Sequence, residues 1–380
     1  MTPRTPSGRS SGRPASGPGS EHWQRNLVLG IAGAAAGAAV AGGAAAAEVA
    51  RRRRVVSKRG AGDVAVPGSL RSPALTVVAD DGVPLHVEVD EFEPSEGAAG
   101  RSEPPLTVVW VHGYALTSDC WHFQRAAYRG LVRSVFYDQR SHGRSGRSSP
   151  ENATIEQCAH DLLTVLDEVA TGTPVVLVGH SMGGMTIAAL AEEHPELFGT
   201  RIVGVGLVAT AADKLDMGRM FLPAVPARLG GELTRRVMRG VGAGHKAVDL
   251  VRDLGGTLSE QTAKYFAFGR DVPRAYLDFA WSMLSTTPTR VLVDFFPSLD
   301  GLDKLHAVEV MGHVPVSIVC GTKDRLTKIS HSRTLHARIS GSRLLEVAGA
   351  GHLVMIESHG QVNAEIDQLL AAATETVEGA

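Results

Sequence analysis

The stretch PVVLVGHSMGG, residues 174–184, carries an apolar run directly into a serine between glycines. Such a run of Val and Leu is typical of a strand covered on both faces, and the apolar segment after it predicts a helix. A sharp strand-to-helix turn would strain Ser181 and free its hydroxyl, and side chains two residues away would collide there. Gly179 and Gly183 remove that collision, while Gly184 lets the helix pack close to the sheet. The pattern also suits a glycine-rich turn without chemistry, which only further motifs can exclude.

From about residue 73 the sequence alternates short β-rich runs with helix-length segments. Residues 154–170 predict one such helix, because Thr154 and Gln157 form a capping box ahead of an apolar face. The alternation predicts an α/β fold with an open, mostly parallel eight-stranded sheet, helices on both faces and an antiparallel hairpin at its start. The predicted strands are residues 74–80, 83–90, 105–111, 134–138, 174–179, 201–210, 314–320 and 343–348.

Residues 211–305 interrupt this alternation. They contain no convincing strand but hold 9 of the 19 aromatic residues, which favours an inserted helical cap over the strand ends. Packing of the insert onto the body must account for most of these aromatics. The candidates for lining a substrate pocket are Phe266, Phe268, Phe279 and Trp281. The prolines that punctuate the insert are Pro223, Pro226, Pro273, Pro288 and Pro297.

Three further polar motifs stand at the ends of predicted strands. His112 and Gly113 follow residues 105–111, in a loop where one amide can meet the amide of Met182. Two such N–H donors form an oxyanion hole, and the loss of one typically costs about 2.7–4 kcal/mol of transition-state stabilisation. Asp324 follows residues 314–320, and His352 follows residues 343–348. The order Ser, Asp, His along the chain suits a nucleophile elbow in an α/β sheet.

Taken together, these motifs resemble those of the α/β-hydrolases, from about residue 73 to the end of the chain. The segment DQRSHGRS, residues 138–145, is similar to the DxRGxGxS turn of that family, with Ser141 where glycine is usual. The resemblance implies a core of residues 73–210 and 306–375 with a cap at 211–305. The implied roles are nucleophile for Ser181, base for His352, orienting acid for Asp324, and oxyanion-hole amides for Tyr114 and Met182.

This constellation predicts a serine hydrolase that cleaves a carboxylic ester with an apolar acyl or alcohol part through an acyl-enzyme. The expected partner is a small-molecule or lipid-like ester. Hydrolysis of a carbon–carbon bond, thioester cleavage and cofactor-free perhydrolysis would use the same residues, because pocket shape selects the substrate. A membrane-anchored binding protein that keeps the fold without catalysis is the alternative from another class. Oligomeric state is not predicted.

Other residues compete for some of these roles. His180 adjoins the serine and is a rival base, although the turn should point the two side chains apart. Asp213, soon after residues 201–210, occupies an alternative position for the acid. His112 is expected to hold the oxyanion loop by hydrogen bonding, and His359 to pack or lie at the surface. The 15 histidines show no HExxH or similar spacing, so neither a metal nor an organic cofactor is expected.

The first 60 residues differ in composition from the rest. They hold ten basic against two acidic residues, leaving 28 basic and 38 acidic residues for the body, which argues against nucleic acid as a partner. Residues 1–22 predict a disordered basic arm, and 23–60 a hydrophobic anchor with a basic flank. The uncharged span 27–47 could cross or lie on a membrane, and the arginines at 51–54 would keep the catalytic domain cytoplasmic. A cleaved export signal and a flexible arm remain alternatives.

Overall fold

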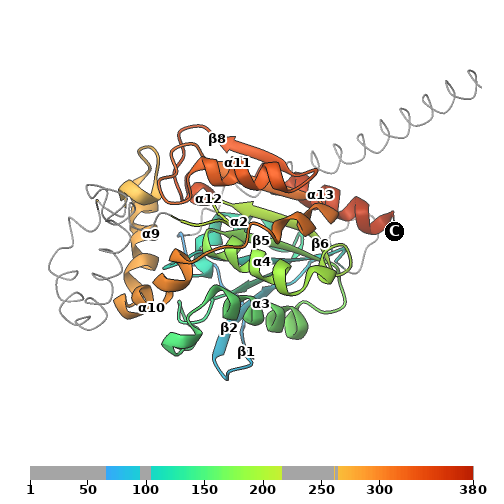
Figure 1. Ribbon diagram of the computed structural model, residues 1–380, viewed down its shortest axis with the longest axis horizontal. Coiled ribbons are helices and arrows are strands. Elements are labelled where there is room, and N and C mark those ends of the chain that lie inside the picture. Colours follow the sequence, from blue (N-terminus) through green and yellow to red (C-terminus); the bar gives the residue numbers. More distant parts are fainter. Residues whose placement is uncertain (1–65, 95–103, 216–260, 262–263, 380) are drawn as a thin grey trace, which may run out of the picture. The chain divides into compact units, whose positions relative to one another are not determined.

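The computed structural model describes residues 66–94, 104–215, 261 and 264–379, all within the compact unit Val49–Ala380. One eight-stranded sheet has the order β1-β2-β4-β3-β5-β6-β7-β8 (Figure 1). β2 pairs antiparallel with β1 and β4, and the remaining pairs are parallel. The predicted sheet and its opening hairpin are confirmed. The strands are Ala74–Val78, Pro84–Asp90, Thr107–Val111, Arg133–Tyr137, Val175–His180, Ile202–Val208, Val316–Gly321 and Arg343–Val347 for β1 to β8.

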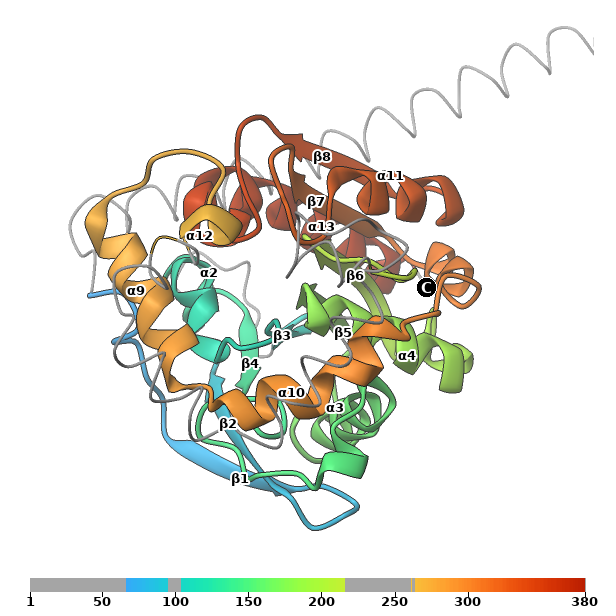
Figure 2. The same ribbon diagram turned by 60° about the vertical axis from the view of Figure 1, so that its left-hand side comes forward.

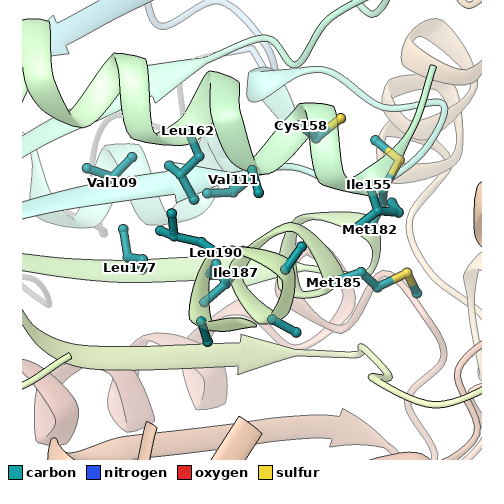
Figure 3. Close-up of a cluster of buried hydrophobic side chains, with 14 of the residues drawn as sticks. Val109, Val111, Ile155, Cys158, Leu162, Leu177, Met182, Met185, Ile187 and Leu190 are labelled. Atoms are coloured by element: carbon teal, nitrogen blue, oxygen red, sulfur yellow. The ribbon is translucent and has the colours of Figure 1, made fainter. Parts of the chain in front are cut away.

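Side chains alternate between the two faces of the central strands, so that each face has its own apolar core. Val109 of β3 and Leu177 of β5 join the first core with α3 (Ile155–Val169) and α4 (Met182–Glu193), as Figure 3 shows. Val108 and Val176 point the other way, toward α2 (His122–Tyr128), α12 (Val354–Glu357) and α13 (His359–Glu378). Helices therefore cover both faces, as the apolar runs predicted.

The predicted capping box at the start of α3 is correct in one half only. Thr154 Oγ1 accepts the Gln157 N–H at 3.1 Å, which satisfies one unpaired amide of the first turn. The Gln157 side-chain amide donates to Asp80 Oδ1 at 2.7 Å, instead of returning to the start of its helix. A tertiary acceptor has replaced the local one.

The described part of residues 211–305, which separates β6 from β7, contains helical residues at 261 and 264–267 and the helices α9 (Arg274–Thr286) and α10 (Thr289–Asp300). In both views α9 leads into α10 through a short turn (Figures 1 and 2). Pro273 and Pro288 precede the two helices, whereas Pro297 lies inside α10. Of the prolines predicted to punctuate the insert, Pro297 therefore does not interrupt its helix, because its missing N–H removes one bond close to the end of α10. The predicted cap limits remain a prediction, and Pro223 and Pro226 lie outside the described residues.

The remaining helices are short or lie at the edge of the sheet. α11 (Ile329–Arg338) packs on β7 and β8. The 3₁₀ helices are η1 (Ser118–Trp121), η2 (Pro150–Asn152), η3 (Pro195–Leu197) and η4 (Val308–His313). No helix in the described ranges has both the length and the apolar character to cross a membrane. The predicted arm and the predicted anchor at 27–47 lie outside those ranges.

The segment DQRSHGRS forms a tight turn after β4. Ser141 has a φ of 67°, in the left-handed region that favours glycine. Its Oγ accepts the Ser148 N–H at 2.9 Å and its own N–H donates to Gly146 O at 2.8 Å. A serine therefore adopts a glycine-like conformation here, and hydrogen bonds from its side chain and its backbone hold it in the turn.

Candidate active site

Ser181 occupies the turn between β5 and α4 in a strained conformation, with φ 50° and ψ −117°. A Cβ on Gly179 would lie 2.6 Å from the carbonyl oxygen of Gly183, and a Cβ on Gly183 only 2.1 Å from that of Val111. Neither contact is compatible with a side chain. Glycine at both positions therefore lets β3, β5 and α4 meet backbone to backbone, which is the turn that the sequence predicted.

The loop after β3 lies against this turn. A Cβ on Gly113 would be 3.1 Å from Ser181 Cβ and 2.6 Å from His180 Nδ1, so only glycine fits. Within the described ranges, the N–H groups of Tyr114 and Met182 donate to no other backbone group. Both therefore remain free to bind an anion, and Met182 opens α4, where the helix dipole adds a partial positive charge.

A hydrogen-bonded network around His112 and Gln139 fixes the loop after β3. The Gln139 backbone N–H donates to His112 Nε2 at 2.8 Å, so Nδ1 carries the proton and donates to Gly113 O at 2.8 Å. The Gln139 side-chain amide donates to His112 O at 2.6 Å and its oxygen accepts from Thr186 Oγ1 at 3.0 Å. His112 holds the loop, as expected. Gln139 was not singled out from the sequence, because its partners are distant along the chain.

Asp324 and His352, 28 residues apart, meet at the ends of β7 and β8. His352 Nδ1–H donates to Asp324 Oδ2 at 2.9 Å, and both side chains are buried. Asp324 Oδ1 accepts the N–H groups of Leu326 at 2.8 Å and Thr327 at 3.0 Å. These bonds fix both the carboxylate and the tautomer of the imidazole.

Thr327 is a site residue that the sequence analysis missed. Its Oγ1 lies 2.9 Å from Asp324 Oδ2, 3.2 Å from His352 Nδ1 and 2.7 Å from the Ala209 carbonyl oxygen. The hydroxyl thus joins the acid and the imidazole to the end of β6. An Asp followed three residues later by Thr is a local turn pattern, and that signal was present in the sequence.

The loop that bears His352, which we call the histidine loop, also touches the serine turn. His180 Nε2–H donates to His352 O at 3.0 Å, and the two rings lie 4.8 Å apart. Ser181 Oγ and His352 Nε2 make no hydrogen bond to any described residue. Catalytic hydrogen bonds are often long before substrate binds, so both atoms remain available for chemistry. His180 is buried and already donates to a carbonyl, which leaves it poorly placed as a base.

The other residues that the sequence offered for these roles contact different groups. Asp213 pairs with His331 at 2.6 Å, not with His352. His359 stacks on Phe123 at 4.3 Å, in agreement with a packing role. No group of three potential ligands suited to a metal ion occurs among the described residues.

The four predicted pocket residues do not share one place. Phe268 and Trp281 line a small, partly open cavity of about 10 Å³ beside α9, with Lys264, Ala267, Leu277, Ala280 and Leu284. Phe279 packs against His122 at 5.9 Å, and Phe266 against Tyr265 at 5.2 Å. The cavity lining includes neither the serine nor the histidine. One lining residue, Ala267, is bonded to the loop that bears His352, because its carbonyl oxygen accepts the Leu353 N–H at 2.8 Å.

Tyr114 links the oxyanion loop to α10. Its hydroxyl donates to the Leu292 carbonyl, and burial raises the pKa of Tyr114 far above its ordinary value. Thr287, just before α10, donates to Ala115 O at 3.2 Å. Ala115 has a φ of 60°, so an alanine in a glycine-like conformation is held there by the insert.

Three buried histidines around the serine turn are held neutral. Burial lowers the pKa of His112, and it lowers the pKa of His180 well below the ordinary value, with His352 acting in the same direction. Burial, followed by the neighbouring His112, lowers the pKa of His142 to about 3. His142 Nε2 and His180 Nδ1 find no partner among the described residues.

The sequence comparisons agree with this architecture. The profile of the alpha/beta hydrolase family matches residues 108–365, and the chain belongs to that family. An uncharacterized protein of Mycobacterium bovis is 28% identical over 264 residues, covering 64% of this chain and 69% of its own.

Two solved structures show the same fold. An esterase from Thermogutta terrifontis has a TM-score of 0.61 at 20% identity, covering 80% of this chain and all of that one. A bromoperoxidase from Bacillus anthracis has a TM-score of 0.60 at 18% identity, covering 78% of this chain and 99% of that one. At these identities, the two structures show the fold and leave the reaction open.

Gly183→Ala tests the backbone contact at the serine turn. The added methyl group would meet Val111 O, so we expect the free energy of unfolding to fall by about 3 kcal/mol. Urea denaturation measures it. Gly360→Ala is the matched control, because nothing lies within 4 Å of that Cβ, and it should change stability by less than about 1 kcal/mol. Equal stability of the two variants would contradict the contact.

His142→Asn tests the neutral histidines. Between pH about 6 and 4 the unfolded chain protonates His142 and the folded chain does not, so stability falls as the pH falls. Removing this histidine should flatten that slope by about 1.4 kcal/mol per pH unit. The measurement is a series of urea midpoints across this range. His306→Asn, at a histidine whose side chain is 64% exposed, controls for the loss of a histidine as such. An unaltered slope in His142→Asn would show that this imidazole is not kept neutral.

Proposed function

We propose that this protein is a serine esterase that cleaves carboxylic esters with an apolar acyl or alcohol part. The observation that carries the proposal is the 2.9 Å bond between His352 and Asp324, in a loop that touches the strained turn bearing Ser181. A base with a fixed tautomer, held next to a turn that carries a serine at a helix N-terminus, is the arrangement that acyl transfer requires.

Each residue has one task in the proposed reaction. His352 Nε2 takes the proton of Ser181 Oγ as that oxygen attacks the ester carbonyl, and returns it to the leaving alcohol. Water then releases the acyl group by the same route. Asp324 keeps the proton on Nδ1 and stabilises the imidazolium that forms. The amides of Tyr114 and Met182 bind the oxyanion, each contributing about 2.7–4 kcal/mol.

The described residues on the insert side support an apolar substrate. The cavity beside α9 has one charged lining residue, Lys264, and its other lining side chains are apolar. With about 10 Å³ of space this cavity is too small for a substrate group, so the apolar preference in the proposal rests on the apolar side chains of this part of the insert. The likeness to an esterase fold agrees with the proposal, whereas the likeness to a bromoperoxidase fold shows that substrates must be tested directly.

Ser181→Ala tests the nucleophile. We expect kcat on a p-nitrophenyl ester to fall by about 10³-fold or more, because the neighbouring Thr210 hydroxyl is already bonded to the Ser181 carbonyl oxygen at 2.6 Å and cannot replace the lost nucleophile. Labelling by a fluorophosphonate probe should disappear as well. A parallel panel of acyl thioesters and vinylogous diketones separates ester cleavage from other reactions of the same residues. Labelling that persists in the variant would overturn the assignment of Ser181.

Asp324→Asn and Asp213→Asn together identify the acid. An amide at position 324 would favour the wrong imidazole tautomer, and we expect kcat to fall by about 10⁴-fold. Asp213 bonds to His331, so its variant should retain kcat within a few-fold. Steady-state kinetics on the same ester measure both. The reverse order of effects would move the acid role to Asp213.

A further inference from the structure

A second buried carboxylate lies just beyond the histidine loop. Glu357 ends α12, and its side chain is 0% exposed. Its Oε2 accepts the N–H groups of Gly351 at 2.8 Å and Gly269 at 3.1 Å, and Oε1 accepts that of Arg270 at 3.2 Å. Three backbone amides from two segments thus converge on one carboxylate, and one of them immediately precedes His352.

The two segments are pressed together at glycines. We call residues 264–270, which precede α9, the strap. A Cβ on Gly351 would lie 2.4 Å from the Gly269 nitrogen, and a Cβ on Gly269 would lie 2.3 Å from Gly349 O. Beyond the contact, Leu353 N–H donates to Ala267 O at 2.8 Å. Both neighbours of His352 are therefore tied to the strap. Leu353 bonds to the strap directly, and Gly351 is linked to it through Glu357.

The acid loop holds the same strap. Arg325, next to Asp324, donates through Nη1 to Tyr265 O at 2.7 Å and to Phe268 O at 3.1 Å. The guanidinium also lies 4.1 Å from the centre of the Tyr265 ring. The loops that bear Asp324 and His352 are thus both bonded to the backbone of the strap. These bonds fix the separation of the two loops independently of the Asp324–His352 hydrogen bond.

The chemistry of Glu357 suits this task better than a neutral side chain would. An ionised carboxylate only accepts hydrogen bonds, so it can serve several N–H groups at once. A glutamine in the same place would turn its NH₂ group toward at least one of those amides. With the NH₂ group toward Gly351 and Gly269, the loop before His352 loses its bond; with the NH₂ group toward Arg270, the strap must shift to avoid facing donors and moves the loop that is bonded to it. A displacement of about 1 Å can cost about 10²-fold in rate.

We propose that Glu357 is a positioning residue for His352, acting through the Gly351 N–H and the strap. It touches neither substrate nor reacting atoms. The proposal rests on the esterase function put forward above, in which His352 must reach Ser181. It adds that the geometry of the base is set by a carboxylate outside the Ser-His-Asp set.

Glu357→Gln in the full chain tests this role, with Glu365→Gln as the matched control. Glu365 is also buried, but it accepts from Ser317 Oγ and Arg343 Nε, both at 2.9 Å, away from the histidine loop. We expect both variants to lower the melting temperature. Glu357→Gln alone should lower kcat on a p-nitrophenyl ester by about 10–100-fold, with KM changed less than about three-fold.

Proton NMR supplies a readout that does not depend on turnover. The downfield resonance of the His352 Nδ1–H, identified by its loss in His352→Gln, should shift in Glu357→Gln and stay in place in Glu365→Gln. If the wild-type protein hydrolyses no ester, the proposed function fails, and this resonance still decides the role of Glu357. An unshifted resonance, or a kcat for Glu357→Gln within three-fold of that for Glu365→Gln, would overturn the inference.

A shorter carboxylate covers the case in which Glu357→Gln does not fold. Glu357→Asp keeps the charge but withdraws it by one methylene, so it can no longer reach all three amides. We expect a folded protein with an intermediate loss of kcat, about 3–30-fold, and a smaller shift of the same resonance. A wild-type kcat together with an unshifted resonance in this variant would refute the positioning role.

Discussion

The close approach of backbone to backbone at Gly183 is the constraint on which the rest of the site depends. The start of α4 lies against the carbonyl oxygen of Val111 at the end of β3, and there is no room for a methyl group between them. That contact bends the chain at Ser181 and leaves the Met182 amide at an open helix end. It also brings the loop after β3 beside the serine. The serine turn and the position of the loop after β3 therefore both depend on the absence of side chains at these glycines.

Parallel pairing then brings the remaining groups to the same edge of the sheet. β3, β5, β6, β7 and β8 run in one direction, so the loops after them converge although they are far apart in sequence. Thr327 shows how closely, since its hydroxyl reaches the acid, the imidazole and the end of β6. Buried networks of this kind fix one arrangement, because an unpaired polar group in the interior is costly.

Local signals in the sequence account for what could be predicted. The strands appear as Val and Leu runs because burial on both faces acts on every residue of a central strand, and the serine turn is a contiguous motif. Gln139 was missed because its partners lie 27 and 47 residues away along the chain. Glu357 was missed because, although Gly351 is only six residues away, its other two amide partners come from the strap, 88 and 87 residues away. Of the capping box predicted at Thr154 and Gln157, only the bond from the Gln157 backbone N–H forms. The Gln157 side chain donates to a more distant acceptor, Asp80. Pro297 stayed inside α10 because the final turn of a helix has few bonds to lose.

The insert between β6 and β7 is bonded to the body at two places among the described residues. Near its beginning Asp213 bonds to His331, and ahead of α9 the strap is bonded to Glu357 and Arg325. Because the strap is bonded to the loops that bear Asp324 and His352, any change in its backbone would be passed to both loops together.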